Sequence, residues 1–245
     1  VSKMMTYDGR YRLGCEGILF ILIEPFLPDS KFLVHFQEVL KHRKPFFIKS
    51  HFIKQIGESD GIGSVIYFEK ETHPISKKLE ENQSVSIFKD ILKPCFKLMI
   101  FGGEHDAVQL CKLAHFNGWE VTVISGPLES KTIYDFPGAT SFYSVSPDDL
   151  ELQSIDDQTA IVLMSHNFSN DLKYLLELKH VKPAYLGMLG PSDRREKLLS
   201  KFLEYCPDVE EDFIESIYGP AGLNIGAETP QEIAVSIISE ILSVV

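Results

Sequence analysis

The stretch "KLMIFGGEHDAVQLCKLAHFNGWEVTVIS", residues 97–125, decides the fold of the second half of this chain. It starts with an apolar run, turns at two adjacent glycines and ends with a second apolar run. Between the two runs, the spacing of small and apolar side chains predicts a helix with one face formed by Ala107, Leu110, Cys111 and Ala114. A strand, a glycine turn, a helix and a second strand in this order are typical of nucleotide-binding α/β folds, so the first question is whether this turn binds a ligand.

The remainder of the second half continues the alternation of strands and helices. We expect strands near 97–101, 120–124, 140–144, 160–165 and 184–188 and helices near 104–117, 168–179, 191–205 and 229–243. The last helix begins with a capping box that runs from Thr229 to Glu232. We therefore predict that residues 96–245 form a Rossmann-like domain, an α/β fold with a doubly wound parallel sheet covered by helices on both faces.

The first half predicts a smaller, mixed α+β domain over residues 1–95. We expect a strand at 17–25, a helix at 30–43, a strand pair at 44–55 and 64–70, and a polar linker with a short helix at 71–95. Glycines and an aspartate between the two paired strands mark the turn that joins them.

The composition excludes several functional classes. The chain has a net charge of −11, and residues 98–245 hold 23 Asp and Glu against 9 Lys and Arg. Because this excess repels a nucleic-acid backbone, we expect no nucleic-acid partner. No apolar run reaches the roughly 18 residues of a membrane span and no secretion signal is evident, so we expect a cytoplasmic protein without membrane contact. The four widely spaced cysteines indicate neither a zinc site nor a disulfide framework.

The glycine turn departs from the pattern of dinucleotide-binding proteins. Gly102 and Gly103 permit the tight bend, but Glu104 places a carboxylate close to where a pyrophosphate would lie. The second strand ends at Ser125, where such proteins usually carry Asp or Glu for the ribose hydroxyls. These departures disfavour NAD(P). Two interpretations stay open: an altered ligand site, or a sheet whose turn only needs small residues.

Polar side chains follow two of the expected strands. His105 and Asp106 begin the helix after the first strand, and His166 follows the strand near 160–165. Because the carboxyl ends of parallel strands meet at one edge of a sheet, we expect these side chains at the edge where ligands bind. The alternative is helix capping or plain exposure to solvent.

A second glycine turn precedes another helix start. In "YLGMLGPSDRREKLL", residues 185–199, Gly190 ends the turn and Arg194 lies in the first turn of the helix. The helix dipole disfavours a cation there, which indicates that the arginine meets an anion. That anion is either a ligand or an acidic side chain of the chain itself.

The loop before the last helix is rich in glycine and proline. In "YGPAGLNIGAETP", residues 218–230, Gly226 and Glu228 lie close to the helix start. The loop either connects two elements only or opens at the ligand-binding edge of the sheet.

Five segments together resemble the xanthine dehydrogenase accessory protein family, also called XdhC/CoxI. Four lie in order in the second half: "FGGEHDA" at 101–107, "VLMSHNFSNDLKYLLEL" at 162–178, "AYLGMLGPSDRREKLL" at 184–199 and "GPAGLNIGAETPQEIAVSIISEIL" at 219–242. The fifth, "LGCEGILFILIEP" at 13–25, resembles the end of the family's N-terminal motif region. The family normally has a further stretch before that motif, so the N-terminal half is expected to be either shortened at its start or diverged.

The resemblance implies a maturation factor rather than a classical enzyme. Family members bind the molybdenum cofactor, protect it while its terminal sulfur is installed, and assist its insertion into a xanthine dehydrogenase-type molybdenum hydroxylase. The resemblance thus implies this hydroxylase and a sulfurtransferase as partners; a homodimer is plausible, although one chain shows no interface. The candidate cofactor-binding residues are Gly102, Gly103, His105, Asp106, His166, Gly190, Arg194, Gly226 and Glu228.

The chain departs from the family's pattern at several positions. Glu104 stands where the family often has glycine, Ser125 where it has an acid, Asn224 where it has Asp, and Tyr218 where it often has histidine. Two other functions therefore stay open: an NAD(P)-dependent oxidoreductase, and a Rossmann-like interaction module without a ligand.

Cys15 lies between small residues in the N-terminal motif. A thiolate at this position could ligate molybdenum or carry sulfur as a persulfide, since the thiolate is the reactive form. The alternative is a small, buried apolar residue.

Overall fold

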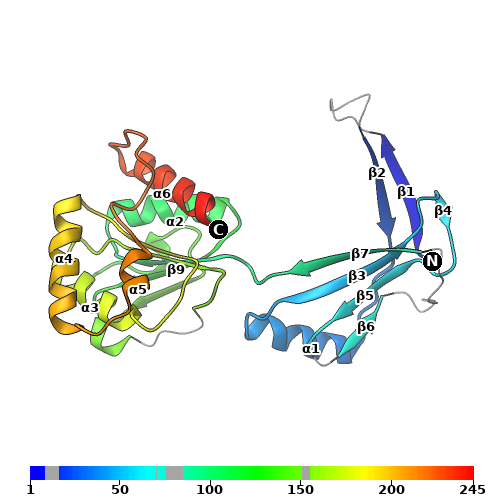
Figure 1. Ribbon diagram of the computed structural model, residues 1–245, viewed down its shortest axis with the longest axis horizontal. Coiled ribbons are helices and arrows are strands. Elements are labelled where there is room, and N and C mark those ends of the chain that lie inside the picture. The colour runs from blue at the N-terminus through cyan, green and yellow to red at the C-terminus, as the bar shows by residue number, and fades with distance from the viewer. Residues whose placement is uncertain (9–16, 70, 76–84, 151–154) are drawn as a thin grey trace. The chain divides into compact units, whose positions relative to one another are not determined.

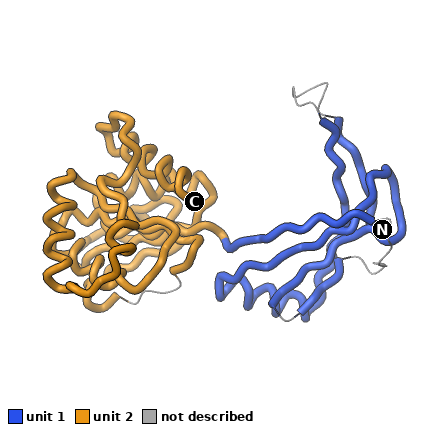
Figure 2. The backbone as a smooth tube through the Cα atoms, in the orientation of Figure 1, with its two compact units in different colours: residues 1–94 blue, residues 95–245 orange. Residues whose placement is uncertain are grey.

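The computed structural model describes residues 1–8, 17–69, 71–75, 85–150 and 155–245. Cys15 lies outside these residues. The chain forms two compact units, Val1–Pro94 and Cys95–Val245, which Figure 2 distinguishes by colour. Each unit has its own sheets and helices and is described by itself.

The second unit is built on a six-stranded sheet with the strand order β10-β9-β8-β11-β12-β13. All of its strand pairs are parallel. The strands are β8 (Lys97–Phe101), β9 (Glu120–Ser125), β10 (Ser141–Ser144), β11 (Thr159–Leu163), β12 (Tyr185–Met188) and the short β13 (Ile217–Tyr218). The predicted doubly wound parallel sheet is confirmed, and β13, which was not expected, extends it by one edge strand.

Helices cover both faces of this sheet. On one face α2 (His105–Phe116) packs against α6 (Pro230–Val244), and the two lie side by side in Figure 1. The other face carries α3 (Phe168–Leu178), α4 (Ser192–Tyr205) and the short α5 (Glu211–Glu215). Two short 3-10 helices, η2 (Ile133–Asp135) and η3 (Pro147–Asp149), lie in the loops.

The buried side chains of β8 alternate between two hydrophobic cores. Leu98 and Ile100 pack with α2 and α6, whereas Met99 and Phe101 pack with α3 and α4. A strand that is buried on both faces reads as a continuous apolar run, which is why the sequence signalled β8 so clearly. β8 lies in the middle of the sheet, between β9 and β11. The strands after β8 first extend the sheet on the β9 side, and the strands from β11 onward extend it on the opposite side, so the strand order reverses between β8 and β11. Ligands bind at such switch points in open α/β sheets.

The first unit combines a helix with two antiparallel sheets. One sheet has the order β2-β1-β4 and the other the order β6-β5-β3-β7. Their strands are β1 (Lys3–Asp8), β2 (Ile18–Ile23), β3 (Phe46–Phe52), β4 (Gly57–Glu58), β5 (Gly63–Tyr67), β6 (Thr72–Pro74) and β7 (Ser86–Leu92). The helix α1 (Ser30–Lys41) begins where the Asp29 carboxylate accepts the backbone N–H of Phe32 at 2.7 Å. The expected pairing of β3 with β5 is confirmed.

The expected linker at 71–95 is wrong for the part of it that the structure describes. Residues 72–74 form β6, and residues 86–92 form β7, which pairs with β3 along its whole length. Every residue of β7 is exposed, so its side chains show no alternation of buried and solvent-facing positions. A strand held mainly by backbone hydrogen bonds leaves little pattern in the sequence.

None of the helices among the described residues combines the length and the hydrophobicity needed to cross a membrane.

Gly102 is required where β8 enters its turn. Its φ angle is 156°, and a Cβ atom at this position would collide with the carbonyl oxygen of Met164. We expect Gly102→Ala to lower the free energy of unfolding by at least about 2 kcal/mol, because strain at the backbone adds to the collision. Urea unfolding measures the change. Gly126→Ala is the matched control, since a Cβ there meets only Asn170 at 3.8 Å, and an equal loss in both variants would contradict the argument.

Candidate functional site

A pocket of about 480 Å³ opens at the carboxyl edge of the parallel sheet. Its walls come from the turns after β8, β9, β10 and β11 and from α3. The lining side chains that matter below are Glu104, Ser125, Glu129, Asn167, Asn170 and Tyr174. Its volume lies within the range of small-molecule sites, and its place is the one where α/β sheets bind ligands. Of the predicted residues, Gly102 and Gly103 line it.

Two carboxylates and one ammonium group surround the glycine turn. A Cβ atom on Gly103 would lie 2.9 Å from the Glu129 carboxylate, so this side chain fills the space that the glycine leaves. Lys131 donates to the carbonyl oxygen of Gly103 and lies 3.6 Å from Glu129 and 3.9 Å from Glu104. One lysine offsets only one of the two negative charges. A pyrophosphate at this turn would therefore meet net negative charge, which disfavours NAD(P) in the same way as the sequence does.

Ser125 offers the pocket an unused polar atom. Its side chain is 2% exposed, and its Oγ has no hydrogen-bond partner among the described residues. A buried hydroxyl without a hydrogen-bond partner costs free energy. A polar ligand that forms a hydrogen bond with this hydroxyl would recover that free energy on binding. A serine also offers a neutral donor and acceptor where a ribose-binding protein has a carboxylate.

Tyr174 adds a second neutral donor. Burial raises the pKa of its hydroxyl to about 12, and the charge of Asp171 acts in the same direction. The phenol therefore stays protonated at neutral pH. Its ring packs edge-on against Phe101 with 4.8 Å between centroids, which fixes the orientation of the side chain beside the pocket.

Asp106 and His166 form a contact that joins two loops. The Nε2 atom of His166 donates to the Asp106 carboxylate at 2.7 Å. Asp106 is 11% exposed and His166 53% exposed, so the carboxylate is largely enclosed and the imidazole faces solvent. His166 has a φ angle of 55°, a backbone conformation that is uncommon for non-glycine residues. The sequence placed both residues on one edge, and the structure brings them together.

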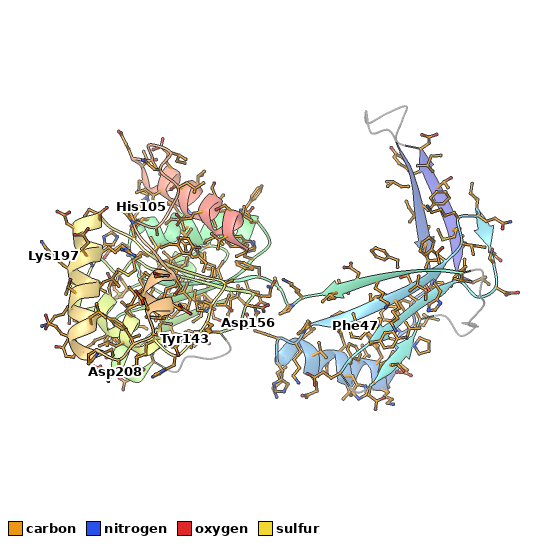
Figure 3. All side chains as sticks on the ribbon, viewed as in Figure 1. Phe47, His105, Tyr143, Asp156, Lys197 and Asp208 are labelled. Atoms are coloured by element: carbon orange, nitrogen blue, oxygen red, sulfur yellow. The ribbon has the colours of Figure 1, made fainter. Side chains whose placement is uncertain are left out.

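The Asp106 carboxylate controls which nitrogen of His166 carries the proton. Because Nε2–H donates to a carboxylate, the neutral imidazole presents Nδ1 as an acceptor. The neighbouring His105, labelled in Figure 3, begins α2, and its imidazole lies 3.5 Å from the Gln109 side chain. Glu104, the residue before α2, makes no capping hydrogen bond, but the Asp106 carboxylate accepts the backbone N–H of Ala107 in the first turn at 2.9 Å. The edge thus combines an oriented imidazole with the N-terminus of a helix.

Arg194 meets an internal carboxylate. It donates to Asp171 at 2.7 Å, and Asp171 is 3% exposed. The same carboxylate accepts the Ser165 hydroxyl at 2.5 Å and the Ser165 backbone N–H at 3.2 Å. A Cβ atom on Gly190 would lie 2.8 Å from the Arg194 side chain, so this glycine makes room for the arginine. Since Ser165 precedes His166, the ion pair fixes the loop that carries the exposed imidazole.

Hydrogen bonds to Glu240 on α6 anchor the loop that contains Gly226 and Glu228. Glu240 on α6 accepts both the hydroxyl of Tyr185 and the backbone N–H of Gly222. Burial, followed by the hydrogen bond to Glu240, raises the pKa of Tyr185, so the phenol stays neutral. Glu228 is exposed, and no hydrogen bond or ion pair in the described part of the chain links it to the Asp106–His166 pair.

Sequence reasoning missed Glu129, Lys131 and Asp171. The first two lie in an irregular loop after β9, and nothing in that loop's pattern shows that it folds back over the glycine turn. Asp171 lies on α3 at a position that looks like an ordinary acidic residue in a first helical turn. Only the tertiary structure shows that it is buried against Arg194.

The fold and the pocket define a Rossmann-like domain with an altered glycine turn. Residues 98–241 match the XdhC Rossmann domain. The chain belongs to the family of proteins that contain this domain.

Curated relatives and a solved structure agree with this assignment. A Bacillus subtilis protein named as a probable xanthine dehydrogenase subunit is 31% identical over 163 residues, which cover 66% of the chain and 46% of that relative. The molybdenum cofactor insertion chaperone PaoD of Escherichia coli is 29% identical over 153 residues, covering 62% and 41%. The chain thus spans less than half of each of these two relatives. A crystal structure described as a xanthine dehydrogenase from Bacillus halodurans shares the fold, with a TM-score of 0.76 at 24% identity over 99% of this chain and 75% of that one.

The Arg194–Asp171 pair generates a stability prediction. We expect Arg194→Met to lower the free energy of unfolding by about 3 kcal/mol, because it leaves a buried carboxylate without its cation. The control is Lys197→Met on the same helix, where we expect a change within about 0.5 kcal/mol. Urea unfolding of both variants checks this. Equal stabilities would show that Asp171 is satisfied without the arginine.

Proposed function

We propose that this chain binds the molybdenum cofactor in the pocket at the sheet edge and assists the maturation of a xanthine dehydrogenase-type molybdenum hydroxylase. The observation that carries the proposal is the polarity of the pocket. Neutral donors and acceptors line its wall, while carboxylates stand at the turn where a dinucleotide would place its phosphates. Two relatives support it by name, one as part of a xanthine dehydrogenase and the other as a molybdenum cofactor insertion chaperone.

The residues present fit the pterin part of the cofactor. A pterin carries amide and amine edges that need neutral donors and acceptors, and Ser125, Asn170 and Tyr174 supply these groups. Lys173 also lines the pocket and pairs with the exposed Asp148 carboxylate at 2.6 Å; by turning from Asp148 to the phosphate it would hold the phosphate away from Glu104 and Glu129. When bound, the cofactor supplies the molybdenum centre with its sulfur ligand. The chain's own residues bind and orient it and keep water from its buried face.

His166 is the proposed contact to the reactive end of the cofactor. Asp106 orients the imidazole of His166 at the sheet edge, so its Nδ1 is available as an acceptor. Cys15 keeps its proposed role as a molybdenum ligand or sulfur carrier, which implies a sulfurtransferase as a second partner. Gly226 and Glu228 are proposed to border the site from the loop before α6.

A protein partner is supported by exposed apolar strands in the first unit. β2 exposes Ile18, Leu19, Phe20 and Ile21, and β7 exposes Ile87, Phe88 and Ile91. Contiguous apolar surface on a folded domain marks an interaction site. We propose the hydroxylase or a second copy of this chain as its partner, and sedimentation of the chain alone and with the apo-hydroxylase distinguishes the two.

Ser125→Ala tests the cofactor site. The Ser125 hydroxyl has no partner among the described residues, so we expect the free energy of unfolding to stay within about 0.5 kcal/mol. Cofactor affinity, measured by titrating the purified chain with molybdopterin and following pterin fluorescence, is expected to fall about fivefold to tenfold, the cost of one hydrogen bond. NAD⁺ is expected to leave the titration unchanged.

Ser236→Ala is the matched control. Ser236 is also a buried serine, but its hydroxyl donates to the Leu223 carbonyl at 2.7 Å, so this variant should lose stability and keep cofactor affinity. Wild-type binding of NAD⁺ in preference to molybdopterin would favour the oxidoreductase function. A folded chain that binds neither would favour the interaction module.

A further inference from the structure

We propose that His35, Glu71 and His73 form a binding site for one divalent transition-metal ion in the first unit. The three residues come from different places in the sequence: His35 lies on α1, Glu71 directly before β6, and His73 within β6. One ligand atom from each residue lies within 4.8 Å of the other two. The proposal is independent of the pocket in the second unit.

The two imidazoles already have the separation that a metal requires. The distance from Nδ1 of His35 to Nε2 of His73 is 3.1 Å. Two nitrogens bound to one zinc ion at 2.0–2.1 Å in tetrahedral geometry lie about 3.3 Å apart. In the metal-free chain the same distance allows a hydrogen bond between the rings. Each ring can carry its proton on its other nitrogen, so both facing nitrogens can become ligands without a change in charge.

Aromatic side chains hold the histidine rings in place. The ring of Phe32 meets that of His73 edge-on at 5.3 Å, and the ring of Phe68 lies 5.4 Å from His73 and 6.3 Å from His35. Phe32 and Phe68 belong to the small core of this unit. A rigid wall of this kind lowers the entropy that the ligands lose on binding.

Glu71 supplies the third ligand and the negative charge. Its carboxylate accepts Lys31 at 2.8 Å through one oxygen, and that hydrogen bond lowers the pKa of the carboxyl group. The Lys31 side chain is 63% exposed, so it can turn into solvent when a doubly charged ion arrives. Two imidazoles and one carboxylate suit zinc, iron, cobalt or nickel, whereas magnesium prefers oxygen ligands throughout.

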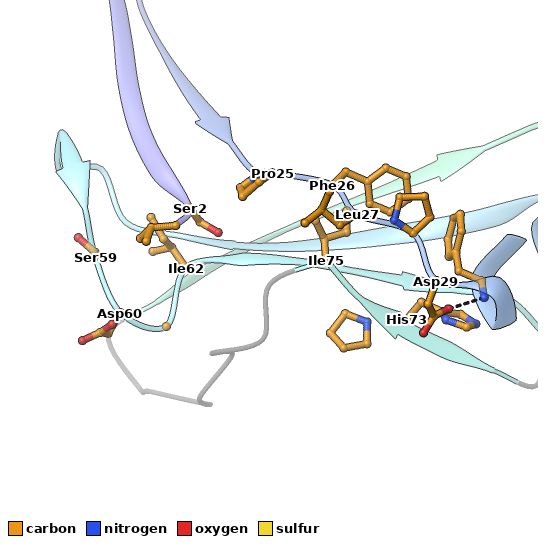
Figure 4. A pocket seen from close by; sticks show the side chains of 15 residues that line it. Ser2, Pro25, Phe26, Leu27, Asp29, Ser59, Asp60, Ile62, His73 and Ile75 are labelled. Atoms are coloured by element: carbon orange, nitrogen blue, oxygen red, sulfur yellow. Dashed lines mark hydrogen bonds between the residues drawn. The ribbon is translucent and has the colours of Figure 1, made fainter.

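The site lies beside a second pocket of about 620 Å³. His73 lines this pocket together with Asp29, as the close-up in Figure 4 shows, and Phe32 belongs to the same lining. Three protein ligands leave at least one coordination position of a tetrahedral ion open, as in zinc sites that bind a water or a substrate. The site therefore resembles an open metal centre rather than a closed structural one.

The test is titration of the tag-free, chelator-treated full chain with Co²⁺, followed by visible absorption, and with Zn²⁺ in competition. We expect one ion per chain. His35→Phe and His73→Phe keep an aromatic ring in the cluster but remove its nitrogens, and each is expected to weaken binding about 100-fold or more, since loss of even an outer-shell partner costs 10–100-fold. Mg²⁺ is expected not to compete.

Lys31→Met and His42→Ala complete the design. Lys31→Met frees the Glu71 carboxylate and removes a positive charge, so metal affinity should rise severalfold. His42 forms an exposed pair with Glu38 on the same helix, and its removal should leave affinity unchanged. Binding that survives both histidine variants, or that is lost in His42→Ala, would overturn the site. So would a wild-type chain that binds no Co²⁺ and shows no rise in melting temperature with Zn²⁺.

Discussion

The second unit depends on the burial of β8 between two cores. Its side chains pack alternately against α2 with α6 and against α3 with α4, so a shift by one residue would move every side chain of the strand into the opposite core. The turn after β8 must then pass the Met164 carbonyl at the end of β11, which only glycine at position 102 allows. This contact brings the ends of β8 and β11 together at the switch point of the sheet. The Asp106–His166 contact joins the loops that follow these two strands.

The contact with the Met164 carbonyl requires glycine at this turn whether or not the turn binds a phosphate. Gly102 is explained by packing alone, and the space above Gly103 is filled by Glu129 rather than left open. A glycine turn therefore does not by itself indicate a dinucleotide site. What distinguishes this site is the balance of charge around the turn, two carboxylates to one lysine, together with a buried hydroxyl at Ser125 that has no partner within the described structure. A neutral heterocycle gains from such a wall, whereas a pyrophosphate is repelled by it.

The sequence predicts this fold better than it predicts the site. Apolar runs such as β8 and capping signals such as Thr229 are local, so the sheet and its helices could be placed to within a few residues. The strand β7 was missed because all of its residues are exposed and only its backbone pairing defines it. The partner of Arg194 could not be chosen from the sequence, since acids near it in sequence were equally good candidates. The observed partner, Asp171, is reached through the packing of α3 against α4.

Carboxylates take opposite roles at the two candidate sites because their surroundings differ. Glu129 is 21% exposed and lies against the glycine turn, so its charge is fixed where an anionic ligand would have to enter. Glu71 is 39% exposed and paired with a lysine that is mostly in solvent. Exposed ion pairs contribute little to stability, so a dication held by two imidazoles can take the carboxylate from Lys31. Lys31 stabilises the charged carboxylate of Glu71 in the metal-free chain. Removal of the Lys31 ammonium group should therefore strengthen metal binding.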